Sequence, residues 1–168
     1  MKKISIILFM FLAWHLLSSV NAVNPTSAED LGNKIFESIK QGDFETIKAL
    51  IVSSEDIIQT INHSNLNEEK KESLKVSLIE KLETDSEKTL IQIENGFKKT
   101  REVFESKKCK NGVEINKIKS QVNPVLGLEI GELEIEFICK KNIETINVEV
   151  IKTESGWFIL EKLRLVVT

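Results

Sequence analysis

Several patterns that mark well-known protein classes are scarce or missing in this chain. The seven glycines of the 168-residue sequence are isolated, so neither a G-x-G-x-x-G run nor a Walker loop supports nucleotide binding. A formal net charge of −3 leaves no basic surface for nucleic acid. The apolar residues needed for a membrane span are confined to the first 20 positions, which excludes a multi-span protein. With 41% hydrophobic and 29% charged residues, what remains is one globular domain, or at most two very small ones.

Side chains that serve as metal ligands or catalytic bases are equally scarce. Two histidines are present, and His15 falls in an N-terminal segment that we expect to be removed. His63 then stands alone, without the convergent ligands of a metal site and without a G-x-S-x-G nucleophile turn. Its Asn and Ser neighbours are typical of a solvated loop. The sequence therefore predicts no catalytic residue, no metal and no cofactor.

The N-terminus has the order of a secretory signal peptide. Two lysines follow Met1, an apolar stretch covers residues 6–17, and small side chains stand at Val20 and Ala22. A membrane anchor is the alternative, but the apolar stretch is shorter than the ~20 residues that span a bilayer. We expect cleavage after Ala22, which removes residues 1–22. Residues 23–168 would then be exported to the periplasm or the medium, with no membrane span left.

The two cysteines, Cys109 and Cys139, are symmetric about Pro124. If the flanking segments form an antiparallel hairpin that turns at Pro124, the cysteines lie opposite each other at the Cβ separation that a disulfide needs. Exported proteins keep disulfides, and the absence of a C-x-x-C pair indicates a structural bond. Two free, buried cysteines are the alternative, because a shift of register by one residue would turn them to opposite faces.

Residues 27–106 have the apolar spacing of helices. Ser27 is a candidate N-cap for a first helix that ends at Gly42, Asp43 caps a short second helix, and Ser54 opens a third.

A longer helical run begins at Asn67 and continues to about residue 106. One helix of that length would be too long for a domain of this size. Residues 84–87, Thr-Asp-Ser-Glu, have the pattern of a capping box. The pattern therefore predicts two helices, 67–83 and 85–106.

From residue 113 to 167 the apolar period changes to two, which is typical of strands. A turn at Lys141-Asn142 would pair three apolar residues across two strands: Phe137 with Ile146, Ile135 with Val148, and Leu133 with Val150.

Two places in this strand region interrupt the alternation. A change of apolar parity near Glu161-Lys162 predicts a bulge in the last strand, and Gly131 predicts a similar bend in the second. The expected fold is α+β: N-terminal helices packed on a curved four-stranded antiparallel meander, forming a cone-like single domain over residues 23–168.

Two short segments carry a family resemblance: Gln41-Gly42-Asp43-Phe44 between two helices, and the late run Ser155-Gly156-Trp157-Phe158-Ile159-Leu160. In these the chain resembles the cystatin-like, nuclear-transport-factor-2-like superfamily, of the secreted bacterial accessory-domain type. The resemblance implies a bent sheet wrapped around helices, with a pocket at the wide end of the cone. Many members are binding or accessory modules. Enzymes of the family use a pocket Asp, His or Tyr, and with no tyrosine and only His63 here, the enzyme branch is not carried over.

Two sets of side chains are candidates for a site. Four large aromatic residues are expected to pack in the core between sheet and helices, with the lining of a ligand pocket as the alternative: Phe97, Phe104, Phe137 and Trp157. Alternating carboxylates on one strand face are typical of an ordinary solvated face, with an acidic surface for a cationic partner as the alternative: Glu132, Glu134 and Glu136.

These patterns favour a secreted, non-enzymatic binding or accessory domain that recognises a protein or a small apolar ligand. Two alternatives stay open: an exported inhibitor or immunity-type protein, and a pocket enzyme of the isomerase or hydrolase type in the same fold. Two close carboxylates with raised pKa values would favour the enzyme. A filled core with one acidic patch would favour the inhibitor, and an open apolar cavity would favour a ligand carrier.

Overall fold

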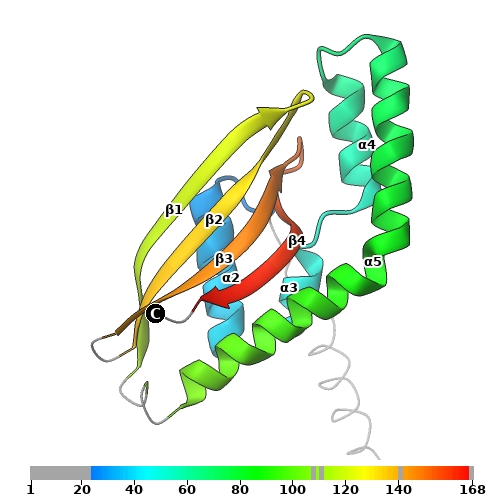
Figure 1. The fold of residues 1–168 in the computed structure, drawn as a ribbon. Helices are drawn as coiled ribbons and strands as arrows, with labels where there is room; N and C mark the ends of the chain where they lie inside the picture. Colours follow the sequence, from blue (N-terminus) through cyan, green and yellow to red (C-terminus); the bar gives the residue numbers. More distant parts are fainter. Residues whose placement is uncertain (1–23, 107–108, 110–111, 140–141, 167–168) are drawn as a thin grey trace, which may run out of the picture.

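The computed structural model describes residues 24–106, 109, 112–139 and 142–166 (Figure 1). Within these residues, four helices precede a four-stranded antiparallel sheet, which confirms the α+β class. The expected signal peptide lies outside the described residues. Among those residues, no helix is both long and apolar enough to span a bilayer.

Three of these helices begin or end at capping residues. Helix α2 (Ala28–Gln41) starts at Ser27, whose hydroxyl accepts a hydrogen bond from the Asp30 amide, and ends at Gly42 with φ 77°. Helix α3 (Phe44–Ala49) is capped by Asp43, as predicted. Helix α4 (Ser54–His63) is capped by Ser53, one residue before the expected start, in a full capping box with Asp56.

Helix α5 (Glu68–Glu105) is one continuous helix of 38 residues, so the predicted break at residues 84–87 is wrong. Its start at the N-cap Asn67 agrees with the prediction. Within the expected break the Ser86 hydroxyl donates to the Glu83 carbonyl at 3.1 Å, a bond within the helix that is typical of bent helices. Figure 1 shows that α5 bends near its middle, so its length is not confined to one side of the domain.

The sheet is the predicted meander, with strand order β1-β2-β3-β4. Its strands are β1 (Val113–Val125), β2 (Leu128–Cys139), β3 (Asn142–Lys152) and β4 (Trp157–Val166).

The β1–β2 hairpin was predicted to turn at Pro124, and this prediction is wrong: the turn lies at Leu126-Gly127. These two residues have φ 50° and 81°, and Val125 pairs with Leu128. A tight turn with positive φ at both central residues matches the twist of the strands. Pro124 lies within β1 opposite Glu129, a position that an edge strand tolerates.

The β2–β3 register differs from the predicted one by two residues. Ile135 pairs with Ile146, Leu133 with Val148, and Phe137 with Glu144. A shift by an even number of residues leaves every side chain on its predicted face, and for that reason the alternation of the sequence could not distinguish the two registers.

The bulge expected near Glu161-Lys162 is confirmed. Val148 pairs with Leu163 and Val150 pairs with Ile159, so β4 has extra residues opposite Glu149. At Gly131 the register is regular, so the bend predicted there is not accompanied by a bulge. A Cβ at Gly131 would lie 2.2 Å from the Gln121 carbonyl oxygen, so this glycine permits a close approach of β1.

The sheet carries apolar side chains on both faces, and each face has its own core. The inner face, which bears Leu133, Ile135 and Phe137, packs against α2 and the C-terminal half of α5. The outer face bears Leu128 and Ile130. It packs against α4 and the N-terminal half of α5 through a second core: Val52, Ile57, Ile61, Leu74, Leu78, Leu82, Leu128, Ile130, Ile151, Phe158 and Leu160.

Helix α5 passes from the outer to the inner face by crossing the edge strand β4 at Gly96. A Cβ at Gly96 would lie 1.8 Å from the Leu163 carbonyl oxygen, so only glycine lets the two backbones approach this closely. Residues 50–52 pair with the start of β4. The Val52 amide donates to the Ile159 carbonyl at 3.0 Å, and the Ile159 amide donates to the Leu50 carbonyl at 2.8 Å. Covering an edge strand in this way protects it from pairing with other chains.

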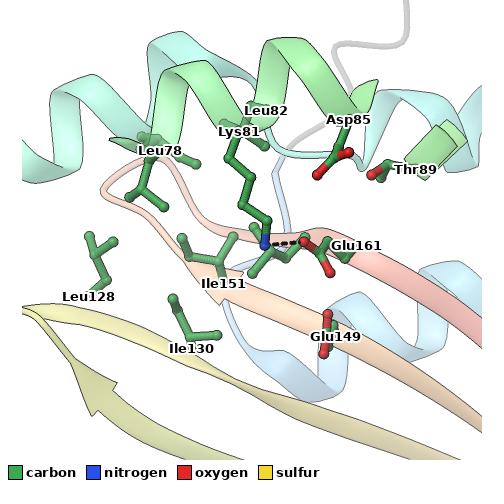
Figure 2. Close-up of a pocket in the computed structure, with 12 residues that line it drawn as sticks. Leu78, Lys81, Leu82, Asp85, Thr89, Leu128, Ile130, Glu149, Ile151 and Glu161 are labelled. Atoms are coloured by element: carbon green, nitrogen blue, oxygen red, sulfur yellow. Dashed lines mark ion pairs between the residues drawn. The ribbon is translucent and has the colours of Figure 1, made fainter. Parts of the chain in front are cut away.

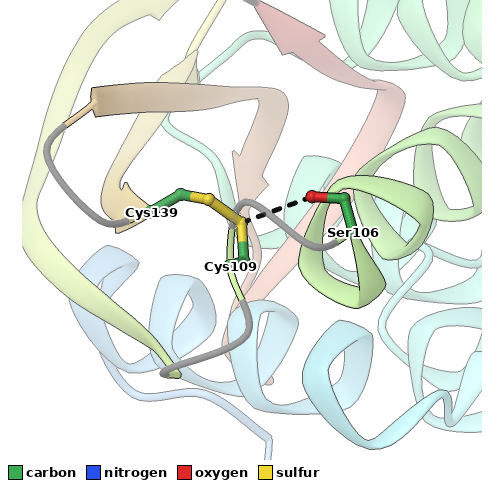
Figure 3. The surroundings of a disulfide bond; sticks show 3 residues. All are labelled: Ser106, Cys109 and Cys139. Carbon is green, nitrogen blue, oxygen red and sulfur yellow. Dashed lines mark hydrogen bonds between the residues drawn. A yellow bond between two sulfur atoms is a disulfide. The ribbon is translucent and has the colours of Figure 1, made fainter.

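The predicted disulfide between Cys109 and Cys139 is present, with a Cα–Cα distance of 4.8 Å (Figure 3). Its geometric basis differs from the prediction, because Cys139 pairs in the sheet with Val113 and Cys109 precedes β1. The Ser106 hydroxyl lies 3.9 Å from Cys109 Sγ, just after the end of α5. The bond therefore ties the entry of β1 to the last residue of β2.

Substitution of Gly96 tests the crossing. Gly→Ala in a helix normally stabilises by about 1 kcal/mol. We expect Gly96→Ala instead to lower the free energy of unfolding by about 2–4 kcal/mol, because the added methyl group meets the β4 backbone. Urea unfolding measures the change.

Gly32→Ala is the matched control, since the nearest atoms to its added Cβ belong to the Ile118 side chain at 3.1 and 3.2 Å. We expect a change within about 1 kcal/mol there. An increase in stability for Gly96→Ala would contradict the described crossing.

Candidate functional site

A cleft of about 270 Å³ lies between α4, the N-terminal half of α5 and the outer face of the sheet (Figure 2). It occupies the part of the second core that the helices cover incompletely. Seven apolar side chains line it: Ile57, Leu78, Leu82, Leu128, Ile130, Ile151 and Leu160. Five polar side chains complete the lining: Lys81, Asp85, Thr89, Glu149 and Glu161.

The apolar wall follows from regular spacing in the helix and the strands. Leu78 and Leu82 are four residues apart and lie on one face of α5, whereas Leu128 and Ile130 are two residues apart and share the outer face of β2. Leu78, Leu82 and Ile130 are only half-buried, in contrast to the fully enclosed side chains of the inner core. The cleft therefore presents apolar surface that a ligand could cover.

Ion pairs cross the polar end of the cleft. The Lys81 ammonium of α5 lies 2.5 Å from a Glu161 carboxylate oxygen of β4, and the dashed line in Figure 2 marks this pair. Lys162 lies 3.0 Å from Glu149 and 3.9 Å from the second oxygen of Glu161. The bulge in β4 brings Glu161 and Glu149 to the same side of the sheet.

The Lys81–Glu161 pair shifts both ionisation equilibria toward the charged forms. The hydrogen bond from Lys81 lowers the pKa of Glu161 from its ordinary value of 4.5, against a smaller opposing effect of burial. The same hydrogen bond raises the pKa of Lys81 from 10.5, with smaller contributions from the charges of Glu161, Asp85 and Glu149.

Asp85 is the carboxylate of the cleft without a partner of its own. Its side chain is half-buried, and in the described part of the chain no hydrogen bond or ion pair joins it to another residue. Three carboxylates and two lysines therefore meet at this end, and their formal charges leave one negative charge in excess.

The four aromatic residues that were candidates for pocket lining pack in the inner core, as the core-packing interpretation predicted. Phe97, Phe104 and Phe137 are at most 8% exposed, and half-buried Trp157 packs against the same core. The rings of Phe104 and Phe137 lie 5.0 Å apart between centroids. The pocket-lining alternative is wrong, because the space between the sheet and α2 is filled by these side chains.

The three glutamates of β2 lie on the outer face, as predicted, but two of them form ion pairs with a lysine of the neighbouring strand. Lys119 of β1 forms an ion pair with Glu136 and lies 3.7 Å from Glu134. The Asn116 amide donates to Glu136 at 3.1 Å, and Glu132 is exposed. The lysine and amide contacts lower the pKa of Glu136. This surface has mixed charge rather than one acidic patch.

A signal for the cleft was present in the sequence. Leu128 and Ile130 share the parity of the glutamates of β2, so the outer face is apolar at one end of the strand and charged at the other. Leu74, Leu78 and Leu82 form a matching stripe on α5 at steps of four residues. The helix break predicted at residues 84–87 obscured the match between this leucine stripe and the apolar end of β2.

His63 lies outside the cleft, as the last residue of α4 rather than in a loop. It is exposed, and its Nδ1 is 2.8 Å from a Glu154 carboxylate oxygen and 3.0 Å from the Gln59 carbonyl oxygen. Within the described ranges, no group of three or more His, Cys, Asp or Glu side chains is arranged to hold a metal ion.

A comparison of the chain with protein-family models, with curated proteins and with solved structures finds no match. The cystatin-like, nuclear-transport-factor-2-like resemblance therefore stays a prediction.

The pH dependence of stability tests the ion pair across the cleft. Glu161 contributes stability above its unfolded pKa and loses it as pH falls through the lowered folded pKa. Lys81 contributes below its unfolded pKa and loses the contribution as pH rises through the raised folded pKa. We expect Lys81→Met to cost most stability between about pH 5 and 10, with a difference from wild type that shrinks outside this window.

In a double-mutant cycle with Glu161→Gln, the coupling should be about 0.2–1 kcal/mol at low salt, because both side chains are partly exposed. Lys88→Met, at an exposed position of the same helix, is the control. Chemical unfolding across pH measures both. A Lys81→Met difference that is constant from pH 3 to pH 12 would show that the pair does not form.

Proposed function

We propose that this chain is an exported, non-enzymatic binding module that takes a small ligand with an apolar body into the cleft between α4, α5 and the sheet. The observation that carries the proposal is the cleft itself: an apolar wall built from helix and sheet, with a few charged groups at one end. Ligand sites typically combine a mostly apolar lining with a small number of polar groups that fix orientation.

The size of the cleft suits a small molecule. Ligand sites usually range from about 300 to 1,000 Å³, and about 270 Å³ lies just below that range. At the ~30 Å³ that one water molecule occupies in the liquid, this is room for roughly nine non-hydrogen atoms. A short alkyl chain with one polar head fits this volume.

Export to the periplasm or the medium is part of the same proposal. The signal-peptide pattern of residues 1–22 supports it, as does the disulfide between Cys109 and Cys139, because disulfides persist outside the cytoplasm.

The cleft supports ligand binding better than it supports the two alternatives. An enzyme would be favoured by close carboxylates with raised pKa values, but Lys81 lowers the pKa of Glu161. An inhibitor would be favoured by one acidic patch, but Lys119 forms an ion pair with Glu136 on the outer face.

Binding of neutral n-octanol, which has nine non-hydrogen atoms, tests the proposal. At about −0.5 kcal/mol per atom, we expect a Kd near 1 mM, measurable by ligand-observed NMR. Leu78→Trp fills the apolar end of the cleft, where Figure 2 places Leu78 opposite Leu128 and Ile151. It should weaken binding at least ~10-fold, since it removes the space for the alkyl chain.

Val76→Trp is the matched control, because Val76 lies on the same helix, outside the cleft, and is 64% exposed. We expect it to bind n-octanol like the wild type. No binding by the wild type, or equal binding by Leu78→Trp, would contradict the proposed function.

A further inference from the structure

Resting on the proposed function, we infer that the cleft selects a cationic amphiphile: a short alkyl chain that carries a primary amine in its ammonium form. The charged groups of the cleft would select the head group of the ligand, in addition to the apolar body that the proposed function assigns. Two features matter: how the polar and apolar lining residues are distributed, and which of the charged groups are already paired.

The polar and apolar groups lie at different ends of the cleft. In Figure 2, Leu78, Leu128, Ile130 and Ile151 gather on one side, and Asp85, Thr89, Glu149 and Glu161 on the other. Lys81 reaches across between them to Glu161. A ligand that covers both ends must itself have an apolar and a polar part.

Two of the three carboxylates at the polar end already form ion pairs with lysines, and Asp85 is the one that remains available to a ligand. Lys81 neutralises Glu161, and Lys162 neutralises Glu149, at distances of 2.5 and 3.0 Å. Asp85 has no hydrogen bond or ion pair within the described part of the chain, although its charge contributes to the raised pKa of Lys81. An entering ammonium group would give this half-buried carboxylate a partner.

An anionic head group meets the opposite situation. It would enter beside Asp85, Glu149 and Glu161, and Lys81, the one lysine among the described lining residues, is already bound to Glu161. Like charges repel more strongly in a partly enclosed site than in water, because the effective dielectric constant is lower there. The cleft therefore discriminates by charge as well as by size.

Three probes of equal length test this inference: octylammonium, n-octanol and octanoate, each with an eight-carbon body. We expect octylammonium to bind the oxidised mature protein at least ~10-fold more tightly than n-octanol at low salt, and octanoate to bind more weakly than n-octanol. The advantage of octylammonium should fall as salt is added, because the charged end of the cleft is partly open to solvent. Titration calorimetry or ligand-observed NMR gives the three constants.

Two variants should change the octylammonium affinity in opposite directions. Asp85→Asn removes the unpaired charge and should lower the affinity by about 10-fold, while n-octanol binding stays unchanged. Lys81→Met keeps the alkyl stem, removes the competing cation and frees Glu161, so it should raise the affinity. Glu87→Gln, at an exposed position two residues from Asp85 on the same helix, is the matched control and should bind like the wild type.

The outcomes separate the two proposals. If n-octanol binds and octylammonium binds no better, or if Asp85→Asn and Glu87→Gln behave alike, the cationic preference is wrong and the apolar cleft stands. If none of the three probes binds, the proposed function is wrong as well. Tighter binding of octanoate than of octylammonium would overturn the charge assignment directly.

Discussion

The contact between the backbones of α5 and β4 at Gly96 is the constraint on which the rest of the structure depends. The Leu163 carbonyl oxygen occupies the place where a side chain at position 96 would begin. Without a side chain between them, a helix of 38 residues can cross the edge of the sheet and continue on its other side. The crossing also covers the edge strand, which otherwise exposes unpaired backbone groups.

The two cores and the cleft are consequences of this crossing. The C-terminal half of α5 packs with α2 on the inner face, where Phe36, Phe104 and Phe137 fill the space. The N-terminal half, with α4, covers the apolar end of the outer face. That cover is incomplete, because Leu78 and Leu82 line a cleft against the sheet, beside the bulge that carries Glu161. The cleft thus combines an unfilled apolar contact with the charges of the bulge.

Local sequence signals predicted where most helices and strands lie. The predictions that failed concern contacts between residues far apart in the sequence, such as the turn and register of paired strands. Caps such as Ser27 and Asp43 act within a few residues, so their positions are legible in the sequence. The hairpin turn was assigned to Pro124 because that residue is midway between the two cysteines. The actual turn, Leu126-Gly127, lacks the usual Asn-Gly or Asp-Gly composition that marks such turns. The disulfide was paired correctly from a hairpin that turns elsewhere, since an oxidised pair needs only proximity.

The cleft and the continuity of α5 were missed for a shared reason. A Thr-Asp-Ser-Glu run satisfies the pattern of a capping box, but inside a helix the same side chains bond to the preceding turn, as Ser86 does to Glu83. Only contact with both faces of a sheet shows why the helix continues. The same contact sets the outer-face role of Leu128 and Ile130, which alternation alone assigns to a solvated face.

Solution NMR of residues 23–168 with the disulfide formed tests the crossing most directly. The structure predicts nuclear Overhauser effects from the Gly96 α-protons to Leu163, together with effects from Leu78 to Leu128 or Ile151 on the outer face and from Phe104 to Phe137 on the inner face. Contacts of Leu78 with inner-face residues such as Leu133, or the absence of any effect between Gly96 and β4, would contradict the account.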